Sequence, residues 1–119
     1  YSSAASDVYK RQGIAKARIT LDPGFGFGKR TAHNLALLEG LSTLQKLGAP
    51  LLIGLSRKSV LGQVAGADVN ERLYASLAAS VIAVMKGANI VRVHDVKATV
   101  EALKVVSAVM KHPLSSKEI

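Results

Sequence analysis

Short apolar runs and longer helical patterns alternate along the chain, and this alternation predicts a series of strand–loop–helix units. The apolar runs that suit strands lie near residues 18–22, 51–55 and 89–94. Apolar residues then recur at helical spacing in segments at about 31–47, at 71–86 and from 96 onward. The strand ends lie thirty-odd residues apart, which is the spacing of βα units in a parallel sheet. The pattern therefore indicates an α/β fold with parallel strands.

The ends of the predicted helices carry typical capping residues. Gly48 and Gly87 stand just past the first and second helices, where a left-handed C-cap is expected. Asn70 and Asp95 stand just before the second and third helices and are predicted to be their N-caps. The second helix is apolar nearly all round, so we expect it to be buried on more than one side.

The composition fits one packed domain without disulfides. Of the 119 residues, 49% are hydrophobic, enough to build a core. Since there is no cysteine, disulfides and thiolate metal sites are excluded, and we expect a cytoplasmic protein. The apolar segment 73–85 is too short to span a bilayer, so no membrane partner is expected. Residues 1–12 show no apolar period, and we set them apart as a disordered or foreign tail before a domain at 13–119.

A formal net charge of +8 points to an anionic partner. Nucleic acid, an anionic membrane surface and a phosphorylated small molecule are the three candidate classes. The basic residues are scattered as singles and pairs, such as Lys29-Arg30, and few aromatic residues stand among them to stack on bases. This pattern favours a small molecule, and a basic nucleic-acid-binding module stays as an alternative.

Polar and ionisable residues gather at the carboxyl end of each predicted strand. They are Asp22, then Ser56, Arg57, Lys58 and Ser59, and then Arg92 and His94. In parallel α/β folds this edge of the sheet carries the site. Each group also has a structural interpretation: Asp22 as a turn cap, Arg57 and Lys58 as a solvated pair, and His94 as a structural histidine. Their coincidence at three strand ends favours a site.

The chemistry of these groups suits a ligand with a polar heterocycle and a phosphate. A carboxylate such as Asp22 accepts two parallel N–H bonds from a guanidine-like edge. Lys58, Arg92 and His94 supply positive charge and hydrogen-bond donors for a phosphate or a carbonyl oxygen. Ser59, at the start of a helix, suits a carboxylate. The sequence therefore predicts a phosphate-bearing heterocycle and a small aromatic acid as ligands.

The glycine-rich loop at 22–29 adds an apolar wall to this site. It matches neither the P-loop pattern nor the dinucleotide-binding pattern. Its alternating glycines leave the backbone open to a ligand, and Phe25 and Phe27 offer flat apolar surface. The three histidines lie far apart in the sequence, without the spacing of a metal site.

Three motifs together resemble those of the dihydropteroate synthase family. They are DPGFGFGK at 22–29, LIGLSRKS at 52–59 and RVHDV at 92–96. The resemblance extends from about residue 13 to residue 110. It implies a (β/α)₈ TIM barrel, of which this chain would be the C-terminal part, the sixth to eighth βα units.

The resemblance also implies a reaction. Members of the family condense 6-hydroxymethyl-7,8-dihydropterin diphosphate with p-aminobenzoate, giving 7,8-dihydropteroate and diphosphate in folate biosynthesis. It further implies Mg²⁺ bound with the diphosphate, a homodimer, a cytoplasmic location and inhibition by sulfonamides.

Carried over by position, the resemblance assigns site residues. The expected pterin-binding residues are Asp22, Gly54, Lys58 and Arg92. The expected p-aminobenzoate-binding residues are Phe27, Lys58 and Ser59. Arg92 and His94 are expected to bind the diphosphate, and Lys58, Arg92 and His94 to be catalytic. Arg57 is expected to support its loop, and no metal ligand is expected in this chain.

Three βα units are too few to close a barrel and leave two sheet edges unpaired. We therefore expect this chain alone to be inactive or nearly so, and poorly soluble. The pterin-binding barrel of a methyltransferase is the alternative within pterin chemistry.

Overall fold

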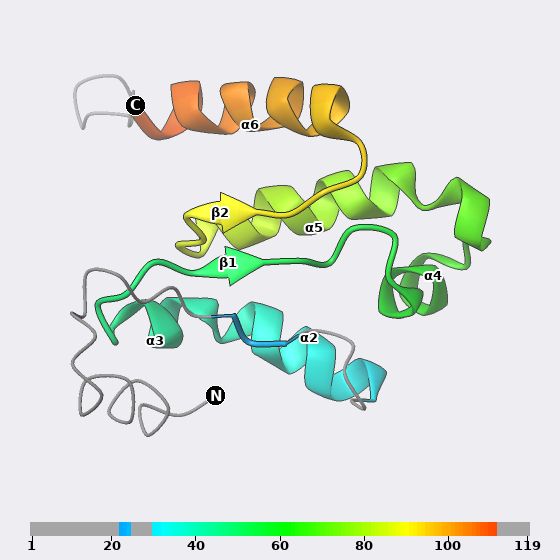
Figure 1. The fold of residues 1–119 in the computed structure, drawn as a ribbon, viewed down its shortest axis with the longest axis horizontal. Helices are drawn as coiled ribbons and strands as arrows, with labels where there is room; N and C mark the ends of the chain where they lie inside the picture. The colour runs from blue at the N-terminus through cyan, green and yellow to red at the C-terminus, as the bar shows by residue number, and fades with distance from the viewer. Residues whose placement is uncertain (1–21, 25–29, 112–119) are drawn as a thin grey trace, which may run out of the picture.

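The computed structural model describes residues 22–24 and 30–111. Figure 1 shows the βα units arranged in chain order, with α2 and α3 at one end, α5 in the middle and α6 at the other end. The elements are α2 (Thr31–Glu39), α3 (Leu41–Gln45), β1 (Leu52–Ile53), α4 (Ser59–Ala65), the 3₁₀ helix η2 (Val69–Glu71), α5 (Leu73–Met85), β2 (Ile90–Val91) and α6 (Val96–Lys111). This is the predicted α/β fold with parallel strands.

The two strands pair in parallel, with Leu52 opposite Ile90 and Ile53 opposite Val91. The ladder includes the Arg92 amide, which donates to the Ile53 carbonyl at 2.9 Å. Both strands lie where the sequence predicts them, but each is only two residues long. Of the predicted strand at 18–22, only residue 22 is described.

The core lies between the sheet and the helices. Its fully buried large side chains are Leu41 from α3, Leu51 beside β1 and Ile53 from β1. Burying a side chain of this kind stabilises the fold by about 1.5–3 kcal/mol. The other buried apolar residues of this cluster are Leu38, Ala49, Leu55, Val60, Leu61, Ala79, Ala83 and Ala88. Because β1 runs through this cluster, it gives the residues that follow it a fixed support.

The helix predicted at about 31–47 is divided in two. It is interrupted at Gly40, whose amide donates back to the Ala36 carbonyl at 2.9 Å. Glycine favours such a break because it has low helix propensity. Gly48 (φ +79°) and Gly87 (φ +108°) have the positive φ expected past the helix ends, whose C-caps are Lys46 and Lys86.

The N-cap prediction for Asn70 is wrong. Asn70 lies inside η2, and α5 begins at Leu73 after Arg72. The Arg72 carbonyl accepts both the amide (2.9 Å) and the hydroxyl (2.6 Å) of Ser76, which closes the first turn of α5 without a side-chain cap. Asp95 does precede α6, but the first turn is closed by Thr99 donating to the Asp95 carbonyl, which leaves the carboxylate available elsewhere.

Helix α5 is buried on one face only within the described part of the chain. Its buried residues are small: Ser76, Ala79, Ser80 and Ala83. The exposed large side chains lie opposite, with Tyr74 82% and Met85 64% exposed. Larger residues on the flanks between these two faces are half-buried: Leu73, Leu77, Val81 and Val84. The fully buried face is therefore narrower than predicted, and the half-buried flanks extend it. No described helix is long and apolar enough to cross a membrane.

Candidate functional site

The predicted site residues gather at the carboxyl ends of β1 and β2. A small cavity of about 130 Å³ there is lined by Gly54, Ser56, Lys58, Arg92, Val93 and His94. Asp22 does not line this cavity, but one of its carboxylate oxygens lies 4.0 Å from the guanidinium of Arg92, which does. The structure thus brings together residues from two strand ends and from the segment before α2.

Arg92 lies directly against Gly54. A Cβ added to Gly54 would stand 2.5 Å from Nη2 and 2.9 Å from Cζ of Arg92, so the guanidinium occupies the space that any other residue would fill. The Arg92 side chain is 59% exposed, so its other face is open to solvent. A planar cation with one face on the backbone and one face open suits stacking on a flat ring.

Asp22 caps a turn and also faces Arg92, so both interpretations of its sequence position, turn cap and site residue, are compatible with the structure. Its Oδ1 accepts the Gly24 amide at 2.9 Å, which is the turn-capping arrangement. Its Oδ2 faces the Arg92 guanidinium. The turn therefore fixes the carboxylate while part of it remains exposed toward the site.

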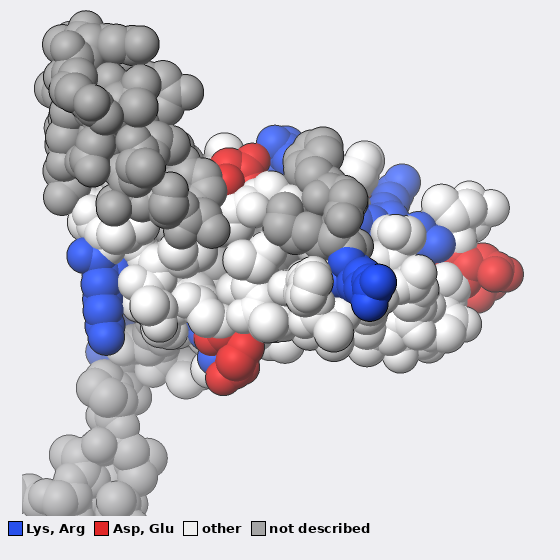
Figure 2. All heavy atoms as spheres, turned by 90° about the horizontal axis from the view of Figure 1, so that it is seen from below, with Lys and Arg blue, Asp and Glu red and all other residues white. Residues whose placement is uncertain are grey.

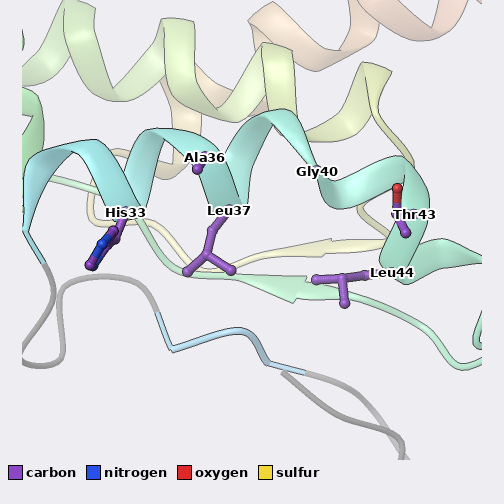
Figure 3. Close-up of a pocket in the computed structure, with 6 residues that line it drawn as sticks. All are labelled: His33, Ala36, Leu37, Gly40, Thr43 and Leu44. Atoms are coloured by element: carbon purple, nitrogen blue, oxygen red, sulfur yellow. The ribbon is translucent and has the colours of Figure 1, made fainter.

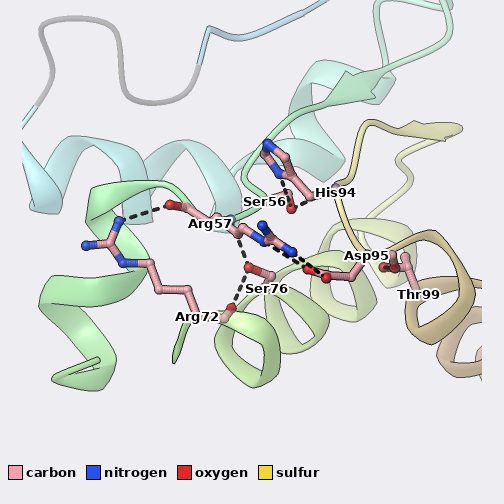
Figure 4. Close-up of polar contacts among 7 residues, drawn as sticks. All are labelled: Ser56, Arg57, Arg72, Ser76, His94, Asp95 and Thr99. Carbon is pink, nitrogen blue, oxygen red and sulfur yellow. Dashed lines mark hydrogen bonds and ion pairs between the residues drawn. The ribbon is translucent and has the colours of Figure 1, made fainter. Parts of the chain in front are cut away.

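His94 is fixed by Ser56, which is buried. The Ser56 hydroxyl accepts the His94 backbone amide at 3.1 Å and lies 2.9 Å from His94 Nδ1 (Figure 4). A hydroxyl has one proton and two lone pairs, so it can serve both contacts. Ser56 belongs to the motif at 52–59, but the sequence alone indicated no role for it.

Arg57, in the segment after β1, forms an ion pair with Asp95, in the segment after β2. Its Nη2 and Nε lie 2.6 Å and 3.1 Å from the two carboxylate oxygens of Asp95 (Figure 4). The hydrogen bonds and charge of this pair raise the pKa of Arg57 and lower the pKa of Asp95. The sequence suggested a supporting role for Arg57, whereas the partnership with Asp95 was missed.

Lys58 and Ser59 stand at the start of α4. The Lys58 amide donates to the Leu55 carbonyl at 3.1 Å, which closes the turn after β1. Lys58 is half-buried and lines the cavity, whereas Ser59 is exposed as the first residue of α4. Phe27 lies outside the described residues.

The charges around this cavity suit an anion. Lys58 and Arg92 are cationic and Asp22 is the single acidic side chain among the predicted site residues. Within 22–24 and 30–111, no three His, Cys, Asp or Glu side chains stand together as a metal site would require. On the face in Figure 2, basic and acidic side chains are scattered among uncharged residues, and several of them stand next to a side chain of opposite charge.

A larger hollow of about 560 Å³ lies on α2 and α3, away from the strand ends. It is lined by His33, Ala36, Leu37, Gly40, Thr43 and Leu44 (Figure 3). His33 is its one ionisable lining residue, so it offers little for chemistry. The smaller cavity at the strand ends is the candidate site.

Comparison with known proteins gives consistent matches. A family model described as "Pterin binding enzyme" matches residues 1–94. This range includes residues 1–12, which showed no resemblance by their motifs alone. The dihydropteroate synthase of Escherichia coli is 53% identical over 109 residues, which is 92% of this chain and 37% of the relative. The "Inactive dihydropteroate synthase 2" of Mycobacterium tuberculosis is 39% identical over 107 residues, 90% of this chain and 34% of the relative.

Solved structures agree. The Yersinia pestis dihydropteroate synthase superposes with a TM-score of 0.89 and 48% identity, covering 92% of this chain and 52% of that one. The Thermus thermophilus enzyme in complex with 4-aminobenzoate gives a TM-score of 0.85 and 46% identity, covering 91% of this chain and 44% of that one. The chain thus spans about a third of the length of the curated relatives it matches.

Proposed function

Because this chain belongs to the pterin binding enzyme family, with dihydropteroate synthases as its relatives, we propose that it carries one side of a dihydropteroate synthase site. The proposal rests on one observation above all: Arg92 lies on Gly54 and beside Asp22, at a cavity that Lys58 and His94 also reach. These residues come from separate strand ends and meet at the edge where parallel α/β folds bind ligands.

In this proposal the pterin meets Asp22 at its edge and Arg92 at its face. The Asp22 carboxylate accepts the N–H groups of the 2-amino and N3 edge of the pterin as a parallel pair. Gly54 lies beneath the ring plane and leaves room for the Arg92 guanidinium, whose open face stacks on the ring. Lys58 contacts the pterin from the β1 connection.

Arg92 and His94 bind the diphosphate. Both belong to the connection after β2, and the Ser56 hydroxyl holds the His94 backbone and ring in place. Positive charge and fixed donors at this point stabilise the negative charge that develops on the leaving diphosphate.

The second substrate is p-aminobenzoate. Ser59 binds its carboxylate, Lys58 shapes its pocket, and Phe27 supplies an apolar wall. The Thermus thermophilus relative, solved in complex with 4-aminobenzoate, supports this substrate class.

The reaction is then largely dissociative. The bond between the pterin methylene carbon and the diphosphate oxygen breaks with its electron pair going to the diphosphate. The amine nitrogen of p-aminobenzoate attacks the resulting pterin cation, a C–N bond forms, and the nitrogen loses a proton. The residues of this chain act by holding the reactants in line and by stabilising the leaving group.

Magnesium has no site among the described residues. The cavity presents Lys58 and Arg92, which repel a divalent cation, and Asp22 is held by Gly24 and Arg92. The described residues therefore fit the diphosphate rather than the metal. A homodimer and a cytoplasmic location remain part of the proposal through the family.

A hybrid enzyme tests the function. In it this chain replaces the segment that it matches in the Escherichia coli relative, and the hybrid is expressed in a strain that lacks its own dihydropteroate synthase. We expect growth without folate end products, and diphosphate release that depends on p-aminobenzoate. Hybrids with Asp22→Asn or Arg92→Ala are the matched inactive controls.

A hybrid that melts like the parent enzyme yet makes no dihydropteroate would refute the proposal and place this chain with the inactive relative. The 119-residue chain, assayed alone, is expected to show no or almost no turnover. Salt-dependent binding of oligonucleotides by the hybrid, without binding of a dihydropterin diphosphate, would favour the nucleic-acid alternative.

A further inference from the structure

The strand register continues past the sheet into the site. Leu52 and Ile90, and Ile53 and Val91, are paired at a separation of 38 residues. Side-chain contacts at the same separation join Leu51 to Asn89, Gly54 to Arg92, Ser56 to His94 and Arg57 to Asp95. The segments that follow β1 and β2 therefore contact each other in the same register that pairs the strands.

The contact between Arg57 and Asp95 stands next to the proposed substrate-binding groups. Arg57 directly precedes Lys58 and Ser59, and Asp95 directly follows His94. The guanidinium meets both carboxylate oxygens, so the pair restrains orientation as well as distance. One ion pair thus connects the p-aminobenzoate side of the site to the diphosphate side.

The backbone of Arg57 is held in an uncommon conformation. Its φ is +57°, the left-handed region that residues other than glycine rarely adopt. The Ser76 hydroxyl lies 2.9 Å from the Arg57 amide, and the Arg72 guanidinium donates to the Arg57 carbonyl at 3.0 Å (Figure 4). Arg72 itself lies against Gly62, where a Cβ would stand 2.6 Å from its Nε. Strain held this firmly is typical of functional sites.

We propose that Arg57 and Asp95 are positioning residues, whose ion pair holds Lys58 and Ser59 at a fixed spacing from His94. This inference rests on the proposed function for the identity of the ligands. Neither side chain is assigned a contact with substrate. Their effect is to keep the amine acceptor and the leaving group in line, where a displacement of about 1 Å can cost about 100-fold in rate.

The chain offers a matched control pair. Lys86 and Glu39 form an ion pair at 3.1 Å between α2 and the end of α5, and none of the proposed site residues belongs to it. An ordinary exposed pair of this kind contributes little beyond local stability. Arg57→Asn is the first test variant, since asparagine tolerates the left-handed region, and Asp95→Asn is the second. Lys86→Gln is the control.

The first measurement uses the hybrid enzyme and does not depend on activity. Backbone ¹⁵N relaxation gives the order parameters S² of the Lys58 and Ser59 amides. We expect S² of about 0.85 in the wild type and in Lys86→Gln, and below about 0.6 in both test variants. Unchanged order in the test variants would overturn the inference.

The second measurement uses the hybrid enzyme. We expect Arg57→Asn and Asp95→Asn each to lower kcat/KM by about 10- to 100-fold, and the double variant to be no worse than either, because one link is lost. Melting temperatures should match that of the Lys86→Gln control. Additive losses, or losses that track melting temperature alone, would indicate a merely structural pair. An inactive unmodified hybrid would refute the proposed function, and the relaxation experiment would then decide the inference by itself.

Discussion

Replacing Gly54 with alanine should displace the Arg92 side chain while leaving the stability of the fold nearly unchanged. Gly54 is buried, and its φ lies outside the range that disfavours L side chains, so alanine fits the backbone. The new methyl group would stand 2.5 Å from Nη2 of Arg92, whereas ordinary contact begins near 3.4 Å. The guanidinium must therefore withdraw by about 0.9 Å, the difference between these distances.

The two consequences of this shift differ in size. The Arg92 side chain is 59% exposed and flexible, so it can move without disturbing the core. A Gly→Ala change in a compatible conformation stabilises by about 0.4–1 kcal/mol, and we expect the free energy of unfolding to stay within about 1 kcal/mol of the wild type. A displacement near 1 Å at the reacting centre costs about 100-fold in rate, or about 2.7 kcal/mol of transition-state stabilisation.

Urea unfolding and kcat/KM, both of the hybrid enzyme, measure the two effects separately. Gly40→Ala serves as the control, since Gly40 lies between α2 and α3 and its Cβ would meet only the backbone oxygens of Ala36 and Leu37. A Gly54→Ala hybrid with unchanged kcat/KM would refute the assigned role of the Arg92–Gly54 contact. A stability loss as large as that of a core truncation would show that Gly54 is needed for packing instead.

Three further predictions concern stability. Ser56→Ala removes the acceptor of the His94 amide and should lower the free energy of unfolding by about 1–3 kcal/mol in urea titrations; an unchanged value would show that the contact is dispensable. Because Arg57 lowers the pKa of Asp95, the stability advantage of the wild type over Asp95→Asn should be full above the ordinary pKa of 3.8 and shrink as the pH falls below it, which unfolding at pH 6 and pH 3 tests. Leu41→Ala should cost about 2–5 kcal/mol, measured by thermal or urea unfolding.

The fold was predictable as far as it depends on local pattern. The strands at 51–55 and 89–94 and the positive φ of Gly48 and Gly87 follow from apolar runs and from the conformational freedom of glycine. The errors concern where one element ends and the next begins. Asn70 is not the N-cap of α5 because it lies inside η2, and α5 begins only at Leu73.

The gathering of the candidate site residues at the strand ends was predictable, and the contacts among them were not. Charged residues at the carboxyl ends of strands mark a site without knowledge of their partners. The partnerships of Ser56 with His94 and of Arg57 with Asp95 depend on which residue of β1 faces which residue of β2. Once the strands are aligned at 38 residues, both pairs follow by counting, and this was the signal that could have found them.

The shared separation of 38 residues also bears on how faithfully the chain folds. A slip of β2 by one residue past β1 would place the Arg92 side chain opposite a residue with a Cβ instead of Gly54, and would separate Arg57 from Asp95 and Ser56 from His94. All of these contacts would be lost together, so the connections would not stabilise a misaligned sheet. Insertions around 66–70, between the two halves of the register, would change the separation without breaking any pair. Such length variation is therefore the kind that evolution can accept here, whereas a single-residue insertion between 51 and 57 is not.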